Sequence, residues 1–349
     1  MNSHLPADDL DHILTHTESL WEGLRGRRLF LTGGTGFFGC WLLESFIWAN
    51  DRLDLNANVV VLSRGPDAFA RKMPHLARHS SITLHQGDVR TFAFPVGSFT
   101  HVIHAATDAN ASLIVEQPLA MLDTIVEGTR RVLDFARTAG VQRFLLTSSG
   151  AVYGRQPSET THVLEEYLGA PDPLSASASY GEGKRLSELL CSVYARQYGF
   201  DAVIARCFAF VGPHLPLDGY YAVGNFLRDG LQGKTIRVGG DGTPYRSYLY
   251  ASDLAIWLWT LLFMGQSARP YNVGSEDEIS IADLASCISR HFGGVPVEIA
   301  KTPPPNKPPE RYVPSTDRAR AELGLRPTVT LEQALDKTVQ WHRAPSALS

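Results

Sequence analysis

The chain has 349 residues, of which 44% are hydrophobic and 19% are charged, and its formal net charge at pH 7 is -4. This composition is typical of a globular protein with a sizeable core. It argues against nucleic acid or an anionic membrane as partners, because both favour a basic surface. Small molecules are the expected partners.

The cysteine and histidine patterns predict neither disulfides nor a metal site. The four cysteines have no C-x-x-C spacing, which favours reduced thiols and a cytoplasmic location. His12 and His16, and likewise His75 and His79, have the spacing of metal ligands on a helix. No third ligand accompanies either pair, so we interpret them as solvated helix faces.

Residues 1–26 are expected to form an N-terminal extension, whose polar and acidic start lacks the pattern of a signal peptide. The strongest apolar run, LAIWLWTLLFM from Leu254, has eleven residues, whereas a membrane-spanning helix needs about 20. We therefore expect a buried helix there and no membrane partner.

Short apolar runs alternate with longer helical patterns through the first half of the chain. The runs are RRLFLTG near 27, NVVVLSR near 58, SITLHQGD near 81, THVIHAA near 100, QRFLLTSS near 142 and AVIARCF near 202. Strands separated by helices indicate a parallel sheet with helices on both faces. The predicted fold class is α/β, a doubly wound parallel sheet of the Rossmann type.

After about residue 209 the sequence becomes rich in glycine, proline and tyrosine, with short strands such as TIRVGG and PYNVGS. This change predicts a smaller C-terminal lobe, interleaved with the first domain. We assign residues 27–208 and about 241–264 to the doubly wound domain, and about 209–240 and 265–349 to a lobe that binds the substrate.

The stretch RRLFLTGGTGFFG places a strand, a glycine turn and a helix start in the order that seats a pyrophosphate on a helix N-terminus. Gly33, Gly36 and Gly39 permit a tight turn, close approach of the backbone and close helix packing. Phe37 and Phe38 begin the helix. The sequence therefore predicts a dinucleotide site.

The second strand ends in Ser63 and Arg64, where a site that prefers NAD usually has an acidic residue for the ribose 2'-hydroxyl. Arg64 could pair with a 2'-phosphate, stack on adenine or simply be solvated. The cofactor is therefore predicted to be NADP or NAD. Asp88, followed by Val89, is placed either to accept from the adenine amine or to form a turn.

Tyr180 and Lys184 lie one helical turn apart in YGEGK, on the same face of a predicted helix. The Lys184 ammonium, together with a positively charged nicotinamide, is expected to stabilise the tyrosinate and lower the pKa of Tyr180. Ser149, at the end of the preceding strand in TSSGAVYG, can hydrogen-bond the reacting oxygen. These three are the predicted catalytic residues.

From about residue 27 onward, nearly the whole chain resembles the extended short-chain dehydrogenase/reductases. Within them it is most similar to the NAD-dependent epimerase/dehydratase family, which modifies nucleotide sugars. The matching segments, in family order, are TGGTGFFG, GDV, HAA at 104 to 106, SSGAVYG, YGEGK, RCFAFVGP, NFLRDGLQG, GDGTPYRSYLYASDLA and YNVG.

The resemblance implies that Tyr180 takes the proton of a sugar hydroxyl while a hydride passes to the nicotinamide. Lys184 would orient the nicotinamide ribose, and Ser149 would hold the sugar oxygen. Ala105 and Ala106 are expected to contact the cofactor.

On the substrate side, a nucleoside-diphosphate sugar is the implied partner. Thr107 is expected to contact it, and Asn225 and Arg246 are expected to meet its diphosphate; a guanidinium fork suits a pyrophosphate. The alternatives are a helix cap for Asn225 and an ion pair with Asp253 or another acid for Arg246. The resemblance also suggests a homodimer built from the helix after Tyr180 and the helix before Gly140.

The chain departs from the family directly after Ser149. The 4,6-dehydratases carry an Asp-Glu pair or at least a Glu there, and decarboxylases also tend to keep the Glu, whereas this chain has Gly150 and Ala151. Elimination of water needs a positioned acid and base, so dehydration is disfavoured. Ile125 and Ala209 replace asparagines usual in epimerases, which leaves the sugar open.

A 4,6-dehydratase or a decarboxylase is disfavoured by the missing acid and base and ranks below the first two of three other functions. A 4-epimerase oxidises C4 and returns the hydride to the other face, and we favour it by a narrow margin. A 4-ketoreductase that takes hydride from NADPH is the alternative, to which Ser63 and Arg64 point. A dinucleotide-binding module without turnover is the third, and the complete Ser149, Tyr180 and Lys184 set argues against it.

Overall fold

A computed structural model describes residues 4–107, 116–218, 221–306 and 308–344. Its centre is a seven-stranded sheet in which every neighbouring pair of strands is parallel. In spatial order the strands are β11 (Pro270–Val273), β6 (Asp201–Cys207), β5 (Arg143–Ser149), β4 (His101–His104), β1 (Arg28–Thr32), β2 (Asn58–Ser63) and β3 (Ile82–Gln86). The order reverses beside β1, as in doubly wound folds. The predicted fold class is confirmed.

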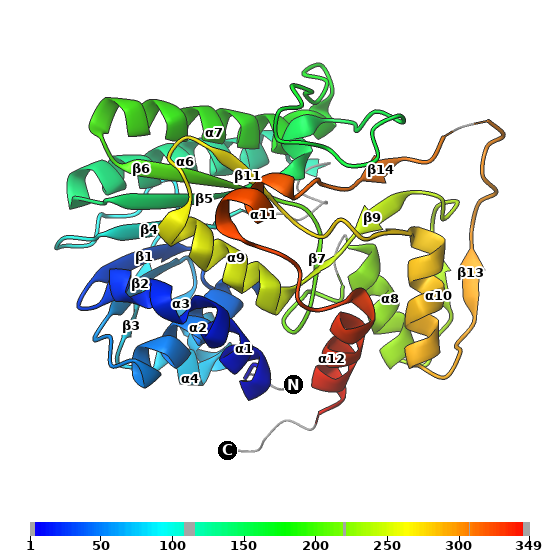
Figure 1. Cartoon of the computed structure of the whole chain (residues 1–349), viewed down its shortest axis with the longest axis horizontal. Coiled ribbons are helices and arrows are strands. Elements are labelled where there is room, and N and C mark those ends of the chain that lie inside the picture. The colour runs from blue at the N-terminus through cyan, green and yellow to red at the C-terminus, as the bar shows by residue number, and fades with distance from the viewer. Residues whose placement is uncertain (1–3, 108–115, 219–220, 307, 345–349) are drawn as a thin grey trace.

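Helices cover both faces of this sheet (Figure 1). On one face lie α6 (Pro118–Ala139) and α7 (Ser179–Tyr198), which pack against each other. On the other lie α1 (Ala7–Thr17), α2 (Phe37–Arg52) and α9 (Ala251–Met264). Two short helices, α3 (Pro66–Lys72) and α4 (Pro74–Ala77), lead from β2 to β3. The interior strands are buried on both faces, so they are apolar runs rather than alternating ones.

Helix α9 contains the apolar run that begins at Leu254. Its side chains are buried from Ala251 to Leu262, so the expected buried helix is confirmed. A helix that is apolar on all sides is stable in water only when other elements surround it. Among the described residues, no helix is both long and apolar enough to cross a membrane.

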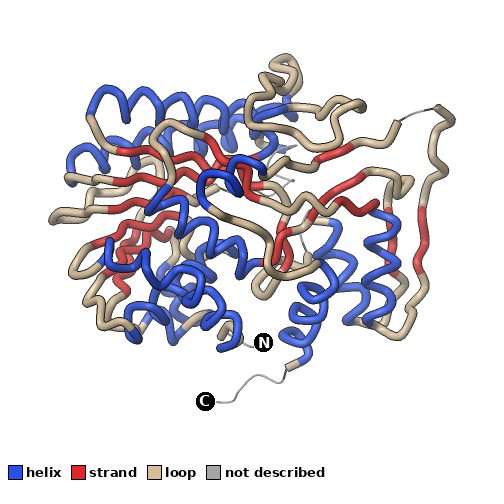
Figure 2. Tube along the Cα trace, in the orientation of Figure 1, coloured by secondary structure: helices blue, strands red, loops and turns tan. Residues whose placement is uncertain are grey.

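The rest of the chain forms smaller sheets and helices beside the carboxyl ends of the central strands, as Figure 2 shows. A three-stranded sheet consists of β12 (Glu278–Ser280), β9 (Tyr245–Ser247) and β14 (Arg311–Tyr312). Two-stranded sheets pair β10 (Leu249–Tyr250) with β7 (Phe210–Val211), and β13 (Val297–Ile299) with β8 (Ile236–Val238). The remaining helices are α8 (Ala222–Leu231), α10 (Ile281–His291), α11 (Asp317–Leu323) and α12 (Leu331–Arg343).

Two strands lie elsewhere than their predicted ranges imply. Strand β11, within the range assigned to the smaller lobe, is the edge strand of the central sheet and pairs with β6. Strand β9, within the range assigned to the doubly wound domain, pairs with β12 and β14 in the small sheet. Helix α9 is the reason for the first difference, because it crosses one face of the sheet and returns the chain to the edge beside β6. The other boundaries stay a prediction.

The described part of the N-terminal extension is docked firmly. Asp9 of α1 is buried, and it accepts hydrogen bonds from Tyr250 Oη at 2.6 Å and from Lys337 Nζ at 2.7 Å. These contacts tie the extension to β10 and to α12, at the junction of the two parts of the chain.

Candidate active site

A cavity of about 630 Å³ opens at the carboxyl ends of the central strands, which is where ligands bind in doubly wound folds. Most of the residues predicted from the sequence line it: Gly33, Gly36, Phe37, Phe38, Ser63, Arg64, Asp88, Val89, Ala105, Ala106, Thr107, Ser149, Tyr180 and Lys184. Gly39, Asn225 and Arg246 do not line it. The fold thus brings together in one cleft residues that end or follow β1, β2, β3, β4 and β5, together with residues of α2 and α7.

Gly33 and Gly36 precede α2 and Gly39 lies in its first turn, and the three are required for different reasons. Gly33 has a φ of +73°, and a Cβ there would lie 2.4 Å from Ala105 O, while a Cβ on Gly39 would lie 2.3 Å from Gly34. Packing within the protein therefore requires glycine at both positions. A Cβ on Gly36 would meet only Gly33 O, at 3.5 Å. Gly36 is the N-cap of α2, so the space beside it suits a pyrophosphate on the helix N-terminus, and the residues fit a dinucleotide.

Asp88, which was predicted to accept a hydrogen bond from the adenine amine, already has a partner in the protein. Asp88 forms a bidentate pair with Arg90, in which Nε donates at 2.9 Å and Nη2 at 3.2 Å. Hydrogen bonding from Arg90 lowers the pKa of Asp88, and the nearby charge of Arg64 adds to this. Ser63 Oγ accepts from Gly65 N at 3.2 Å. The adenine contact of Asp88 stays a prediction, and it would have to share a carboxylate that Arg90 already holds.

Lys184 is buried and holds its ammonium in a fixed place. Its Nζ donates to Thr107 Oγ1 at 2.7 Å and to Thr147 O at 2.8 Å. Burial lowers the pKa of Lys184 to about 8. Thr107, which was predicted to contact the substrate, therefore orients the cation in the protein itself.

Tyr180 lies at the start of α7 and shares a hydrogen bond with the hydroxyl of Ser149. Burial raises the pKa of Tyr180, and the Ser149 hydroxyl offsets only part of this. The lowering expected from Lys184 is thus not present in the protein by itself. Ser149 also accepts from Ala151 N at 3.1 Å, which caps the short helical turn Gly150–Tyr153.

The two residues expected to bind the diphosphate have partners of their own. Asn225, in α8, accepts from Arg228 Nη1 at 3.1 Å. Arg246, in β9, donates to the carbonyl of Tyr245 at 2.8 Å. Asp253, the alternative partner proposed for Arg246, accepts hydrogen bonds from Thr328 and Val329 instead. The diphosphate contacts stay a prediction.

One residue at the reacting centre was not predicted from the sequence. Tyr312 of β14 places its hydroxyl 3.4 Å from Ser149 Oγ, although 163 residues separate the two in sequence. Its ring packs on Phe208, with the centroids 4.7 Å apart. Its segment carried no recognised motif, so only the pairing of β14 with β9 could have revealed it.

A buried ion pair supports the strand end that carries Ser149. Ser148 Oγ donates to Glu188 Oε1 at 2.5 Å, and Arg206 Nη2 lies 2.7 Å from Glu188 Oε2. The guanidinium of Arg206 also donates to Tyr153 Oη at 2.9 Å. Removing one member would leave a buried charge without its partner, which typically costs about 3–5 kcal/mol.

Potential metal ligands gather outside the cleft. Within the described chain, ligand atoms of His4, Glu44 and His75 lie within 4.8 Å of one another. Glu44 already accepts from Leu5 N at 3.0 Å and lies 3.2 Å from His75 Nε2, so these contacts link the N-terminal extension to α2 and α4. The absence of a metal stays a prediction.

Known proteins resemble the chain in sequence. UDP-glucuronic acid decarboxylase 1 of Xenopus tropicalis is 31% identical over 318 residues, which is 91% of this chain and 72% of that protein. UDP-glucuronic acid decarboxylase 6 of Arabidopsis thaliana is 30% identical over 313 residues, covering 88% of this chain and 86% of that protein.

Solved structures resemble the fold. The dTDP-glucose 4,6-dehydratase DesIV of Streptomyces venezuelae, solved with NAD bound, superposes with a TM-score of 0.78 at 25% identity, covering 90% of this chain and 97% of that one. The UDP-glucose 4-epimerase of Thermotoga maritima, solved with UDP-glucose, has a TM-score of 0.75 at 21% identity, covering 90% of this chain and 98% of that one; this likeness concerns the fold alone.

The predicted family is confirmed directly. The model of the NAD dependent epimerase/dehydratase family matches residues 29–274, which include the glycine turn, Ser149, Tyr180 and Lys184. The protein is thus an enzyme of the extended short-chain dehydrogenase/reductase type that modifies nucleotide sugars, with NAD as the cofactor of its family. The chain belongs to the NAD dependent epimerase/dehydratase family.

Proposed function

We propose that this enzyme decarboxylates a UDP-linked hexuronic acid after transient oxidation of the sugar at C4. The observation that carries the proposal is the complete set of Ser149, Tyr180 and Lys184 in the dinucleotide cleft, which can oxidise a sugar at C4. The similarity to UDP-glucuronic acid decarboxylases over about nine-tenths of the chain supports it.

The missing acid and base weigh against dehydration more than against decarboxylation. Dehydration needs a base to remove the C5 proton and an acid for the departing hydroxyl. In a 4-keto hexuronic acid the C6 carboxylate is β to the ketone. The electrons of the C5–C6 bond can therefore move toward the ketone oxygen as CO2 leaves, and no C5 proton has to be removed.

The roles of the three residues follow from their contacts. Tyr180 accepts the proton of the sugar 4-hydroxyl and later returns it, and Ser149 holds both that oxygen and the phenol. Lys184, fixed by Thr107 and Thr147, would orient the nicotinamide ribose beside Tyr180. NAD, held by the glycine turn, supplies the chemistry of accepting and returning a hydride at C4.

A 4-epimerase is the second candidate, and it was favoured from the sequence. The position of Ala151 supports it, because decarboxylases of the family tend to carry a glutamate there and an epimerase needs no further acid or base. The same three residues would serve, with rotation of the 4-ketosugar in place of loss of CO2.

A homodimer is also proposed. Leu186, Leu189 and Val193 follow one another along α7 and are 41%, 57% and 46% exposed. An apolar stripe on one exposed helix face suits a second copy of the chain better than it suits water. Helix α6 packs beside α7 and would complete the interface.

A panel of substrates separates the candidates. The protein is incubated with UDP-glucuronic acid labelled at C6, with UDP-glucose and UDP-galactose, and with a 4-keto nucleotide sugar plus NADPH. Labelled CO2 and a UDP-pentose, formed without net consumption of cofactor, support the decarboxylase. Interconversion of UDP-glucose and UDP-galactose without CO2 release supports the epimerase. Stoichiometric consumption of NADPH supports the 4-ketoreductase and contradicts both.

A further inference from the structure

A second phenol reaches the reacting centre from the smaller lobe. Tyr312 Oη lies 3.4 Å from Ser149 Oγ, and Tyr180 contacts the same serine hydroxyl. Ser149 therefore stands between two phenols that come from different parts of the chain. If Ser149 holds the sugar 4-oxygen, the hydroxyl of Tyr312 lies within reach of the carbons next to C4.

The glycine that follows Ser149 makes room for this phenol. A Cβ on Gly150 would lie 2.8 Å from Tyr312 Oη and 2.7 Å from the ring of Phe208. Real Cβ atoms do not approach so closely, so any side chain at position 150 would force Phe208 or Tyr312 to shift. Tyr312 thus occupies the space next to Gly150, the position where the related dehydratases carry an acidic residue.

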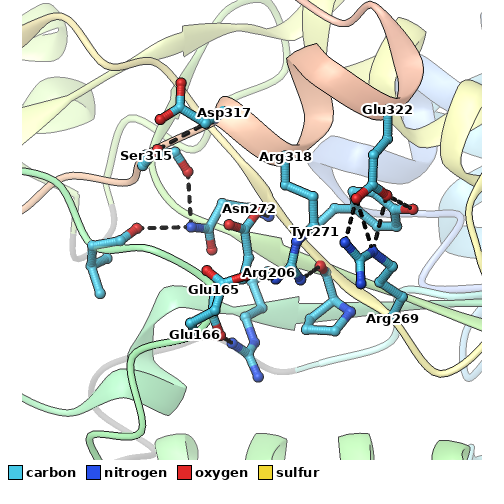
Figure 3. Close-up of polar contacts among 12 residues, drawn as sticks. Glu165, Glu166, Arg206, Arg269, Tyr271, Asn272, Ser315, Asp317, Arg318 and Glu322 are labelled. Carbon is cyan, nitrogen blue, oxygen red and sulfur yellow. Dashed lines mark hydrogen bonds and ion pairs between the residues drawn. The ribbon is translucent and has the colours of Figure 1, made fainter.

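The backbone around Tyr312 is held in place on both sides. Strand β14 pairs with β9, with Tyr312 opposite Arg246. On the other side, Val163 N donates to Val313 O at 2.9 Å and Ser315 N donates to Val163 O at 2.9 Å. Figure 3 shows the Asn272 amide directed at Ser315, whose carbonyl it reaches at 2.9 Å. The position of Tyr312 is therefore preorganised, as a proton donor requires.

Tyr312 can also exchange its proton. Burial raises the pKa of Tyr312 to about 12, although the Ser149 hydroxyl and the charge of Arg246 lower it in part, so the phenol is protonated at neutral pH. The guanidinium of Arg246 lies 5.8 Å from the centroid of the ring. Because the residue is partly exposed, a tyrosinate formed there can regain a proton from water.

We propose that Tyr312 is a catalytic acid that protonates C5 of the sugar after CO2 has left; this rests on the proposed decarboxylation. The C5–C6 bond breaks, its electron pair forms the enolate across C4 and C5, and CO2 departs. The enolate electrons then form the C5–H bond with the phenol proton of Tyr312 and leave a tyrosinate, while the C4 ketone is restored. The tyrosinate takes one proton from solvent, so each turnover incorporates one solvent proton.

The test compares Tyr312→Phe with the wild type on UDP-glucuronic acid labelled at C6, in water and in deuterium oxide. Phenylalanine keeps the ring that packs on Phe208. We expect the steady-state kcat to fall about 100-fold and KM to fall with it, so that kcat/KM stays within about threefold of wild type, because Tyr312 acts after the irreversible loss of CO2. The labelled CO2 released in the first turnover should keep its wild-type rate, because Tyr312 acts after that step. Wild-type product formed in deuterium oxide should carry one deuterium at C5.

Tyr245→Phe is the matched control. Tyr245 lies in the same small sheet, where Arg311 packs over its ring at 4.5 Å, and its hydroxyl is not part of the contacts around Ser149. This variant should keep wild-type kcat.

The outcomes separate the inference from the proposed function. A wild-type kcat in Tyr312→Phe would overturn the inference alone. Equal losses of first-turnover CO2 and of kcat would overturn it as well, because Tyr312 would then act by positioning Ser149. A wild-type enzyme that releases no CO2 would overturn the proposed function and the C5 step with it.

Discussion

The ammonium of Lys184 lies 2.7 Å from the hydroxyl of Thr107, so the cation of the active site is oriented by the end of β4. This contact favours the charged form of Lys184, whose pKa burial lowers to about 8. The ammonium is therefore present below about pH 8 and is lost as the pH rises through that value.

The first prediction concerns Thr107→Val, which removes the acceptor. The pKa of Lys184 should fall further, and the alkaline decline of kcat/KM should begin at lower pH, by about one unit for the loss of one charge-assisted hydrogen bond. The pH profile of kcat/KM measures this. Thr107→Ser keeps the hydroxyl and should behave as wild type, whereas an unchanged profile in Thr107→Val would show that the contact does not hold the charge.

Alanine substitutions of Gly39 and Gly36, at the start of α2, should affect different properties: the first stability and the second NAD affinity. Gly39→Ala would place a Cβ 2.3 Å from Gly34, so it should destabilise the fold by about 1–3 kcal/mol. Gly36→Ala meets only Gly33 O at 3.5 Å and should unfold at nearly the wild-type temperature. Its NAD affinity should nevertheless fall at least about tenfold, because a methyl group would stand where the pyrophosphate approaches. Thermal melts and calorimetric titration with NAD measure both. Wild-type affinity in Gly36→Ala would place the pyrophosphate elsewhere.

Arg64 lines the cleft at the end of β2, where the ribose 2'-position is read. If its guanidinium serves a 2'-phosphate, Arg64→Ala should weaken NADP about tenfold or more and leave NAD within about threefold, because only NADP carries that charge. Dissociation constants for both dinucleotides decide the matter. Equal effects on the two cofactors would mean that Arg64 stacks on adenine or acts through Asp88 instead.

The stripe on α7 predicts the oligomeric state. Leu189→Glu should convert a dimer to a monomer at micromolar concentration, because a charge would be buried in an apolar interface. Val96→Glu is the control, since Val96 is 92% exposed and lies between β3 and β4, outside the apolar stripe on α7. Light scattering after size-exclusion chromatography reports the mass. A wild-type protein that is already monomeric would contradict the proposed homodimer.

The sequence predicted the fold and much of the cleft because both depend on local patterns. Alternating strands and helices imply the doubly wound sheet, and the end of each central strand then has to lie at one edge. The glycine turn and Ser149 are at such ends, and Tyr180 and Lys184 are near the start of α7.

The features that were not predicted depend on contacts between distant segments. Tyr312 reaches Ser149 only because β14 pairs with β9. Thr107 orients Lys184 because both side chains meet in the cleft, and Asp88 is engaged by Arg90 through side-chain geometry that spacing does not reveal. The range that contains β11 was assigned to the smaller lobe, although β11 pairs with β6, because a four-residue strand carries no sign of its neighbour.

The most direct test of oxidation at C4 by Tyr180, followed by loss of CO2, is a first-turnover measurement. Tyr180→Phe is compared with wild type for the release of labelled CO2 from UDP-glucuronic acid with NAD bound. We predict stoichiometric release by the wild type and a rate at least about 100-fold lower in Tyr180→Phe, because the 4-hydroxyl keeps its proton and no ketone forms. Equal rates of CO2 release in the two proteins would contradict the account.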